Sequence, residues 1–105
     1  MDNESKGLKI EQSREGYVLT CKLTGWLDPN TSSDLVAKID LTDITVLVFD
    51  MKAVEYVFSS GIRAFLMLQK MLDEKGGSVK LVNVSENIRS IFEYAGLEGM
   101  LEHKA

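Results

Sequence analysis

Residues 44–49 are the most restrictive segment of this chain, because they read Ile-Thr-Val-Leu-Val-Phe without a charged side chain. An unbroken run of β-branched and large apolar residues is typical of a strand that is covered on both faces. The run ends at Asp50, and residues 51–56 are then expected to form a short loop. A strand of this kind indicates an α/β fold, in which helices pack against a partly parallel sheet.

Two strands are predicted ahead of this run. Residues 8–12 alternate between apolar and polar side chains, which indicates a half-exposed strand at the edge of a sheet. Residues 13–16 favour a turn, and residues 17–24 are rich in strand-forming side chains. The second strand is expected to bury one face, made of Tyr17, Leu19, Cys21 and Leu23. The two strands together predict a hairpin.

Three helices are predicted in the rest of the chain. The first covers residues 31–39 and begins with Thr31-Ser32-Ser33-Asp34, which resembles a capping box. The second covers residues 60–74, where apolar residues recur at helical spacing before a Gly-Gly pair. The third follows Ser85, which is expected to cap it, and ends before Gly96.

The order of elements predicts one domain that spans residues 1–105, with a core over residues 8–101. Residues 78–84 are expected to form another strand, and the pair Met100-Leu101 is a candidate for a last short one. The order is therefore β-β-α-β-α-β-α, with an optional final strand. A hairpin followed by α-β units predicts a mixed sheet of about four to five strands that is parallel in its later part, with about three to four helices.

Composition and charge exclude several classes of function. The 105 residues carry a net charge of −4, which disfavours binding to nucleic acid or to an anionic membrane. Cys21 and His103 are the only residues of their types, so a disulfide within the chain and a Cys/His metal site are excluded. No apolar run is long enough to span a membrane and no signal peptide pattern is present, which predicts a cytoplasmic protein.

Enzyme chemistry also finds no support in the residue pattern. No base lies beside a nucleophile in the sequence, and the pair Gly76-Gly77 lacks the spacing of a phosphate-binding loop. We therefore predict no catalytic residue, no metal site and no cofactor.

Ser59-Ser60-Gly61, at the start of the long predicted helix, is the first of two candidate sites. One interpretation is structural, because a serine at this point can cap the helix and Gly61 lets the chain turn sharply. The other is functional, because a helix N-terminus favours an anion and a serine there can carry a phosphoryl group. Such a group would add about −1.5 to −2 charges to a protein interface.

Residues 25–31 are the second candidate site, between a strand and a helix. In the structural interpretation, Trp26 packs over the sheet edge while Asp28 or Thr31 caps the helix. In the functional interpretation, Trp26 is an aromatic anchor in a loop that binds a partner protein.

Taken together, these segments resemble the STAS domain family, specifically the small bacterial anti-sigma factor antagonists, over residues 8–101. The family pattern Gly-x-Leu-Asp-x-x-Thr is matched by Gly25, Leu27, Asp28 and Thr31. Residues 50–56 are similar to the family's Asp-Leu-Ser-x-Val-x-aromatic pattern, and residues 58–62 occupy the place of its Asp-Ser-Ser-Gly-Leu signature.

The resemblance implies a regulatory binding protein that is not an enzyme. An anti-sigma factor with a serine kinase domain would be its partner, Ser59 would be the phosphoacceptor, and a serine phosphatase would reverse the modification. Binding would release a sigma factor, and phosphorylation would weaken the complex. The residues expected to contact the partner are Trp26, Asp28, Thr31, Phe58, Ser59, Ser60, Gly61, Ile62 and Arg63.

Phe58 departs from the family signature, because it replaces the aspartate that precedes the acceptor serine. This change removes a carboxylate and, with Trp26 and Tyr56, adds apolar surface if these rings lie close together. The departure favours an alternative, in which the chain is a STAS subunit of a stress-signalling or lipid-transport assembly and is not phosphorylated.

Overall fold

The computed structural model describes residues 7–101, so His103 lies outside the described residues. The order of elements predicted from the sequence is confirmed. The elements are β1 (Leu8–Glu15), β2 (Val18–Leu27), α1 (Pro29–Lys38), β3 (Val46–Val57), α2 (Ser59–Asp73), β4 (Ser78–Val82), α3 (Glu86–Tyr94) and the short 3-10 helix η2 (Glu98–Met100).

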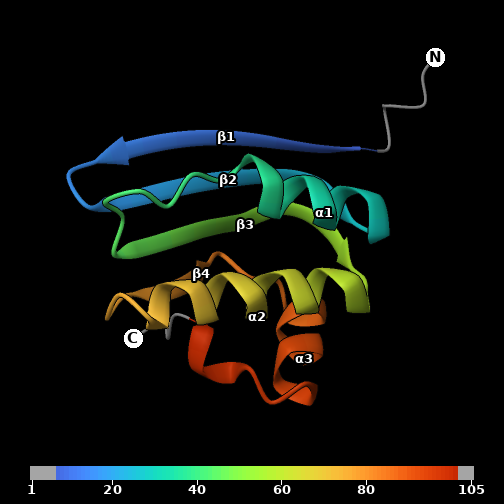
Figure 1. The fold of residues 1–105 in the computed structure, drawn as a ribbon. Helices are drawn as coiled ribbons and strands as arrows, with labels where there is room; N and C mark the ends of the chain where they lie inside the picture. Colours follow the sequence, from blue (N-terminus) through green and yellow to red (C-terminus); the bar gives the residue numbers. More distant parts are fainter. Residues whose placement is uncertain (1–6, 102–105) are drawn as a thin grey trace.

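The four strands form one mixed sheet in the order β1-β2-β3-β4 (Figure 1). β1 pairs antiparallel with β2 as the predicted hairpin, whereas β2, β3 and β4 run parallel, as expected for strands joined by helices. The candidate last strand is reduced to one residue, because Leu101 forms a single parallel bridge to Leu81 while Met100 belongs to η2.

The helices pack on one face of the sheet, so the prediction that β3 is covered on both faces is wrong. Leu47 and Phe49 point into the core, whereas Val46 and Val48 on the opposite face are only half-buried. Thr20, Val48 and Lys80 lie side by side across three parallel strands on that open face. Side chains of the neighbouring strands shield Val46 and Val48 from solvent, so the apolar run needs no second layer of helices.

Aromatic side chains from three elements form the centre of the core. Phe65 of α2 lies edge-on to Phe49 of β3, with ring centroids 4.9 Å apart, and packs against Phe92 of α3 at 5.4 Å. Cys21 is fully buried in the same core, and burial raises the pKa of its thiol to about 11. Tyr17, which was expected on this face, is 68% exposed because it lies in the turn before β2 begins.

β3 is twice as long as predicted, and this change matters most for the site. Residues 51–56 do not form a loop but continue the strand to Val57. They pair with the far end of β2 across two irregularities in register, between Lys22 and Thr24 and between Gly25 and Trp26. Bulges of this kind allow pairing to continue where the simple alternation of side chains is broken.

Candidate functional site

The two candidate segments meet at one edge of the sheet. Because β2 and β3 are parallel, both end at this edge, and each passes directly into the helix that follows it (Figure 1). The last pair in the register is Leu27 with Val57, and the backbone N–H of Phe58 donates to the carbonyl oxygen of Leu27 at 2.9 Å. The starts of α1 and α2 are therefore held side by side.

Asp28 and Thr31 cap α1 reciprocally. The backbone N–H of Thr31 donates to Asp28 Oδ1, and the backbone N–H of Asp28 donates to Thr31 Oγ1, both at 2.9 Å. The capping box predicted from Thr31 to Asp34 is wrong, because α1 begins earlier, at Pro29, a residue suited to the first position of a helix. The Thr31 hydroxyl also donates to the carbonyl oxygen of Trp26 at 2.8 Å and so holds the preceding backbone.

Asp28→Ala is expected to lower the free energy of unfolding by about 1 kcal/mol, the usual cost of losing a helix cap. Asp34→Ala is the matched control on the same helix and should change it by less than about 0.5 kcal/mol, since Asp34 is exposed and takes no part in the cap. Urea denaturation followed by circular dichroism measures both values. Equal losses for the two variants would contradict the assignment of Asp28 as the cap.

The start of α2 has no side-chain cap. The structural interpretation of the serine pair, in which a serine caps this helix, is therefore wrong. Phe58 occupies the N-cap position, and its side chain makes no cap hydrogen bond. Ser59 is the first residue of the helix and is exposed. Ser60 is half-buried, and its hydroxyl oxygen is enclosed without a hydrogen-bond partner among the described residues.

Three aromatic side chains pack together around Phe58, which precedes Ser59 in the chain, and we call them the aromatic cluster: Trp26, Tyr56 and Phe58. The rings of Trp26 and Phe58 are stacked with centroids 6.5 Å apart, and Tyr56 lies edge-on to Phe58 at 4.9 Å. Tyr56 is 46% exposed and Phe58 39% exposed, so the aromatic cluster presents apolar surface to solvent, directly before the exposed residue Ser59. The condition set for apolar recognition, that Trp26 and Phe58 lie close together, is therefore met.

The remaining predicted contact residues divide into buried and accessible positions. Gly61 is buried where α2 crosses the ends of β2 and β3, and Thr31 is 7% exposed. Ile62 is half-buried, Asp28 is half-buried in its cap, and Arg63 is exposed one turn into α2. The structure therefore brings all of these residues to one edge, but Gly61 and Thr31 lie beneath the surface.

Ser32 is a residue that sequence reasoning did not single out. It is only 4% exposed, and its hydroxyl oxygen has no hydrogen-bond partner within residues 7–101. The sequence offered one signal, its place in a serine pair on a short helix, but nothing that separated it from a solvated serine. Over the same residues, no group of His, Cys, Asp and Glu is suited to hold a metal, and no helix has the length and apolarity needed to cross a membrane.

Comparison with known proteins connects this geometry to one family. The model of the STAS domain family matches residues 11–104. The anti-sigma-B factor antagonist of Bacillus subtilis is 36% identical over 55 residues, which are 52% of this chain and 50% of that protein. The anti-sigma F factor antagonist of Paenibacillus polymyxa is 27% identical over 94 residues, covering 86% of this chain and 80% of that protein.

Solved structures show the same fold. The anti-sigma factor antagonist SpoIIAA in its unphosphorylated form aligns with a TM-score of 0.81 at 21% identity, covering 92% of this chain and 89% of that one. The Bacillus cell fate determinant SpoIIAA in the phosphorylated form aligns with a TM-score of 0.75 at 20% identity, covering 92% of both chains. With nearly its whole length matched by the family model and this fold in common, the chain belongs to the STAS domain family.

Proposed function

We propose that this chain is an anti-sigma factor antagonist that binds an anti-sigma factor with a serine kinase domain and so releases a sigma factor. Phosphorylation of Ser59 by that kinase would switch the chain off, and a serine phosphatase would restore it. The observation that carries the proposal is the exposed Ser59 at the start of α2, beside the aromatic cluster, in a STAS chain. The curated relatives are named as antagonists of anti-sigma factors, which supports this assignment.

The difference between the two serines supports Ser59 as the acceptor. A kinase must bring the hydroxyl oxygen in line with the phosphoryl group, so the oxygen has to be accessible. Ser59 is exposed, whereas the oxygen of Ser60 is enclosed. The free N–H groups and dipole of the first turn of α2 would stabilise a phosphate on Ser59. SpoIIAA, which shares the fold, is known in phosphorylated and unphosphorylated forms.

The surface around Ser59 suits a protein partner. Aromatic residues and arginine are enriched among the residues that contribute most to binding between proteins. Here the aromatic cluster and Arg63 border the exposed Ser59, while Thr31 and Gly61 support that surface from below. In this role the chain is a binder and a substrate, so it needs no catalytic group of its own, and it acts in the cytoplasm with the transcription machinery.

The proposal is tested with the purified chain, the anti-sigma kinase from the same organism and ATP. Intact mass spectrometry is expected to show one added phosphate on the parent chain and on Ser60→Ala, and none on Ser59→Ala. Phe58→Asp restores the family carboxylate beside the acceptor and is expected to be phosphorylated faster than the parent. Binding of the kinase without any phosphate on the parent chain would refute the switch, and failure to bind would refute the antagonist assignment.

A second candidate function rests on Phe58. Phe58 occupies the position of the family aspartate, so its ring, stacked on Trp26, replaces a carboxylate beside Ser59. This replacement favours binding of an apolar partner surface over phosphorylation of Ser59. In this case the chain would be a STAS subunit of a larger assembly, of the stress-signalling or lipid-transport kind. The same experiment separates the two candidates, because a subunit would copurify with its partners from cells whether or not ATP is present and would carry no phosphate.

A further inference from the structure

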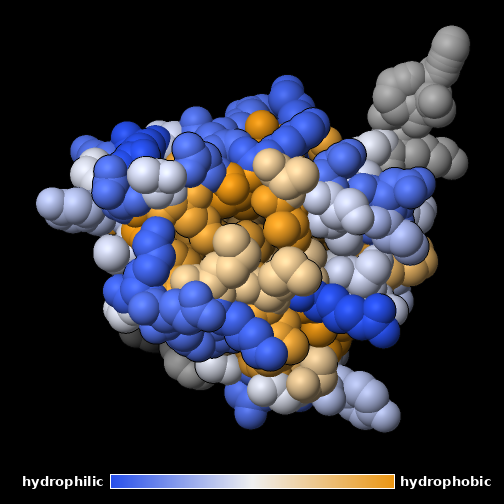
Figure 2. Space-filling view, in the orientation of Figure 1, coloured by the Kyte–Doolittle hydropathy of each residue, from blue (hydrophilic) through white to orange (hydrophobic). Residues whose placement is uncertain are grey.

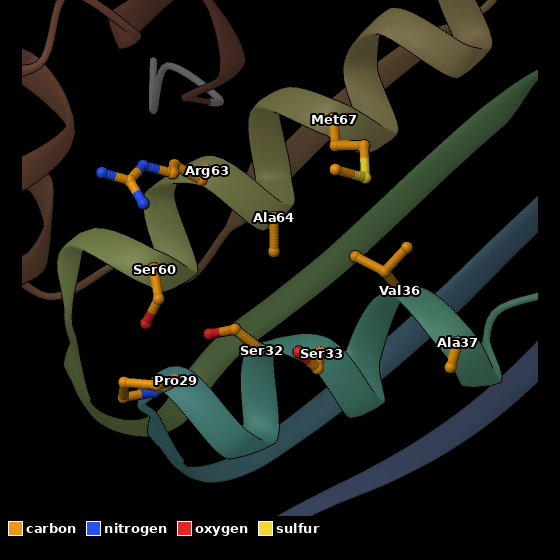
Figure 3. A pocket seen from close by; sticks show the side chains of 9 residues that line it. All are labelled: Pro29, Ser32, Ser33, Val36, Ala37, Ser60, Arg63, Ala64 and Met67. Carbon is orange, nitrogen blue, oxygen red and sulfur yellow. The ribbon is translucent and has the colours of Figure 1, made fainter.

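A groove runs between α1 and α2 on the helical face of the molecule. It measures about 350 Å³ and lies within the apolar area at the centre of the face shown in Figure 2. Figure 3 shows its walls, which come from both helices. The lining residues are Pro29, Ser32, Ser33, Val36, Ala37, Ser60, Arg63, Ala64 and Met67. This volume falls at the lower end of the range of small-molecule sites.

Two hydroxyl oxygens without partners mark one end of the groove. Ser32 Oγ and Ser60 Oγ are both enclosed and form no hydrogen bond within the described part of the chain. They point toward one another from opposite walls (Figure 3), and the Ser32 side chain is 4% exposed. An enclosed hydroxyl that is left unbonded destabilises a protein, and most such groups in native structures are satisfied. The pair therefore offers two free hydrogen-bonding groups to a polar atom of a ligand.

The charge at this end favours an anionic group. Arg63 is the only charged residue among those that line the groove, and no carboxylate is among them; its guanidinium points outward, away from α1 (Figure 3). It forms no ion pair with a carboxylate of residues 7–101. Ser60 lies in the first turn of α2, where the helix dipole favours negative charge. A negatively charged acceptor group would therefore accept hydrogen bonds from both hydroxyls and would also be stabilised by the positive end of the α2 dipole.

The other end of the groove is apolar. Val36 of α1 points toward α2, on whose side Ala64 and Met67 line the groove (Figure 3). Met67 is 51% exposed, and methionine side chains adapt their shape to flexible apolar ligands. This wall suits an unbranched aliphatic chain, which would cover surface that is now open to water.

We propose that the groove binds an aliphatic monocarboxylate of medium chain length. The carboxylate lies between the hydroxyls of Ser32 and Ser60 at the first turn of α2, and the chain lies along Val36 and Met67. This site is distinct from the exposed hydroxyl of Ser59 and does not depend on a kinase or on the proposed function. It makes the chain a receptor for a small amphiphile in addition to its role with a protein partner.

The experiment uses the full chain, labelled with ¹⁵N, and titrates it with sodium octanoate below the concentration at which micelles form. Amide shifts are expected to gather on residues 29–37 and 60–67, the two walls of the groove. Affinity should rise roughly two- to fourfold for each methylene from butyrate to octanoate, because each one covers apolar surface. Octan-1-ol, which has the tail without the charge, should bind at least tenfold more weakly, and inorganic phosphate should not compete with octanoate.

Two exposed methionines on α2 supply a matched pair of variants. Met67→Gln is expected to weaken octanoate binding about threefold or more, since Met67 lines the groove. Met71→Gln makes the same change at a residue that is 42% exposed and outside the lining, so binding should stay within twofold. Ser32→Ala is expected to weaken binding about tenfold through the lost hydrogen bond. Without ligand, the same variant should melt no lower than the parent chain.

Three results would overturn the proposal. The first is the absence of saturable octanoate binding to a chain whose amide spectrum shows that it is folded. The second is an affinity that does not depend on chain length, which would indicate a site for anions alone. The third is an equal loss for Met67→Gln and Met71→Gln, which would place the tail outside the groove.

Discussion

A phosphate on Ser59 is expected to weaken the complex with the anti-sigma factor roughly 30- to 150-fold, a loss of about 2–3 kcal/mol. The modification adds about −1.5 to −2 charges. In the free chain this charge lies at the start of α2, where a helix N-terminus tolerates it. In the complex, however, it has to be desolvated beside the aromatic cluster, whose exposed rings offer no donor to an anion apart from the Tyr56 hydroxyl and the Trp26 indole N–H.

Isothermal titration of the anti-sigma factor with the phosphorylated and unphosphorylated chains measures this loss. Ser59→Ala is the control and should bind within about threefold of the unmodified chain, because it removes a hydroxyl without adding charge. The phosphorylated chain should also keep the melting temperature of the parent within about 5 °C, since a change of 1 kcal/mol moves that temperature by about 4–8 °C. Equal affinity of the two forms would show that the phosphate is not the switch.

Gly61→Ala is expected to lower the free energy of unfolding by about 1–3 kcal/mol, the usual cost of overpacking. A Cβ atom at this position would lie 2.8 Å from Val57 Cγ1 and 2.9 Å from Leu27 Cβ. Both neighbours are buried in the core at the ends of β3 and β2. The better helix propensity of alanine offsets up to about 1 kcal/mol, which is why the lower part of the range is included.

Gly99→Ala is the matched control, because a Cβ atom there would meet nothing within 4 Å. Its free energy of unfolding should stay within about 0.5 kcal/mol of the parent. Urea denaturation of both variants gives the comparison. A Gly61→Ala chain as stable as Gly99→Ala would mean that α2 does not approach the strand ends as closely as described.

The sequence predicted the order of elements because strong local signals mark most of them. Ser85 accepts the N–H of Ile88 at the start of α3, as expected for a cap. Gly96 ends the same helix with a φ of 79°, in the left-handed region that glycine adopts without strain. Such signals depend on neighbouring residues alone, so they can be read before the tertiary structure is known.

The errors arose where distant segments decide the outcome. The apolar run of β3 ends at Asp50 and a loop is predicted over residues 51–56, yet pairing with β2 through bulges keeps this segment extended to Val57. The apolar run of the same strand predicts cover on both faces, whereas neighbouring strands alone shield the open face. The sequence leaves Asp28 and Thr31 open as the cap of α1 and also favours a capping box from Thr31 to Asp34, whereas the structure places the cap at Asp28.

The sequence predicts which residues belong to the candidate site, but not which of them are exposed at its surface. Sequence patterns identify the residues around Trp26 and Ser59. They do not predict that Trp26 stacks on Phe58, which the structure shows. Which of these residues are buried depends on how α2 crosses the strand ends, and this is why Gly61 and Thr31 lie below the surface. The paired hydroxyls of Ser32 and Ser60 come from two helices, so no local pattern could have revealed them.

The hydrogen bond from the Phe58 N–H to the Leu27 carbonyl has a consequence for how this surface can be recognised. It joins two segments that lie about 30 residues apart in the chain, and each contributes one ring to the stack of Trp26 and Phe58. The epitope is therefore discontinuous and exists only while the sheet is intact. A synthetic peptide that carries Ser59 and its neighbours would lack half of it, so a partner that reads this surface distinguishes a folded chain from an unfolded one.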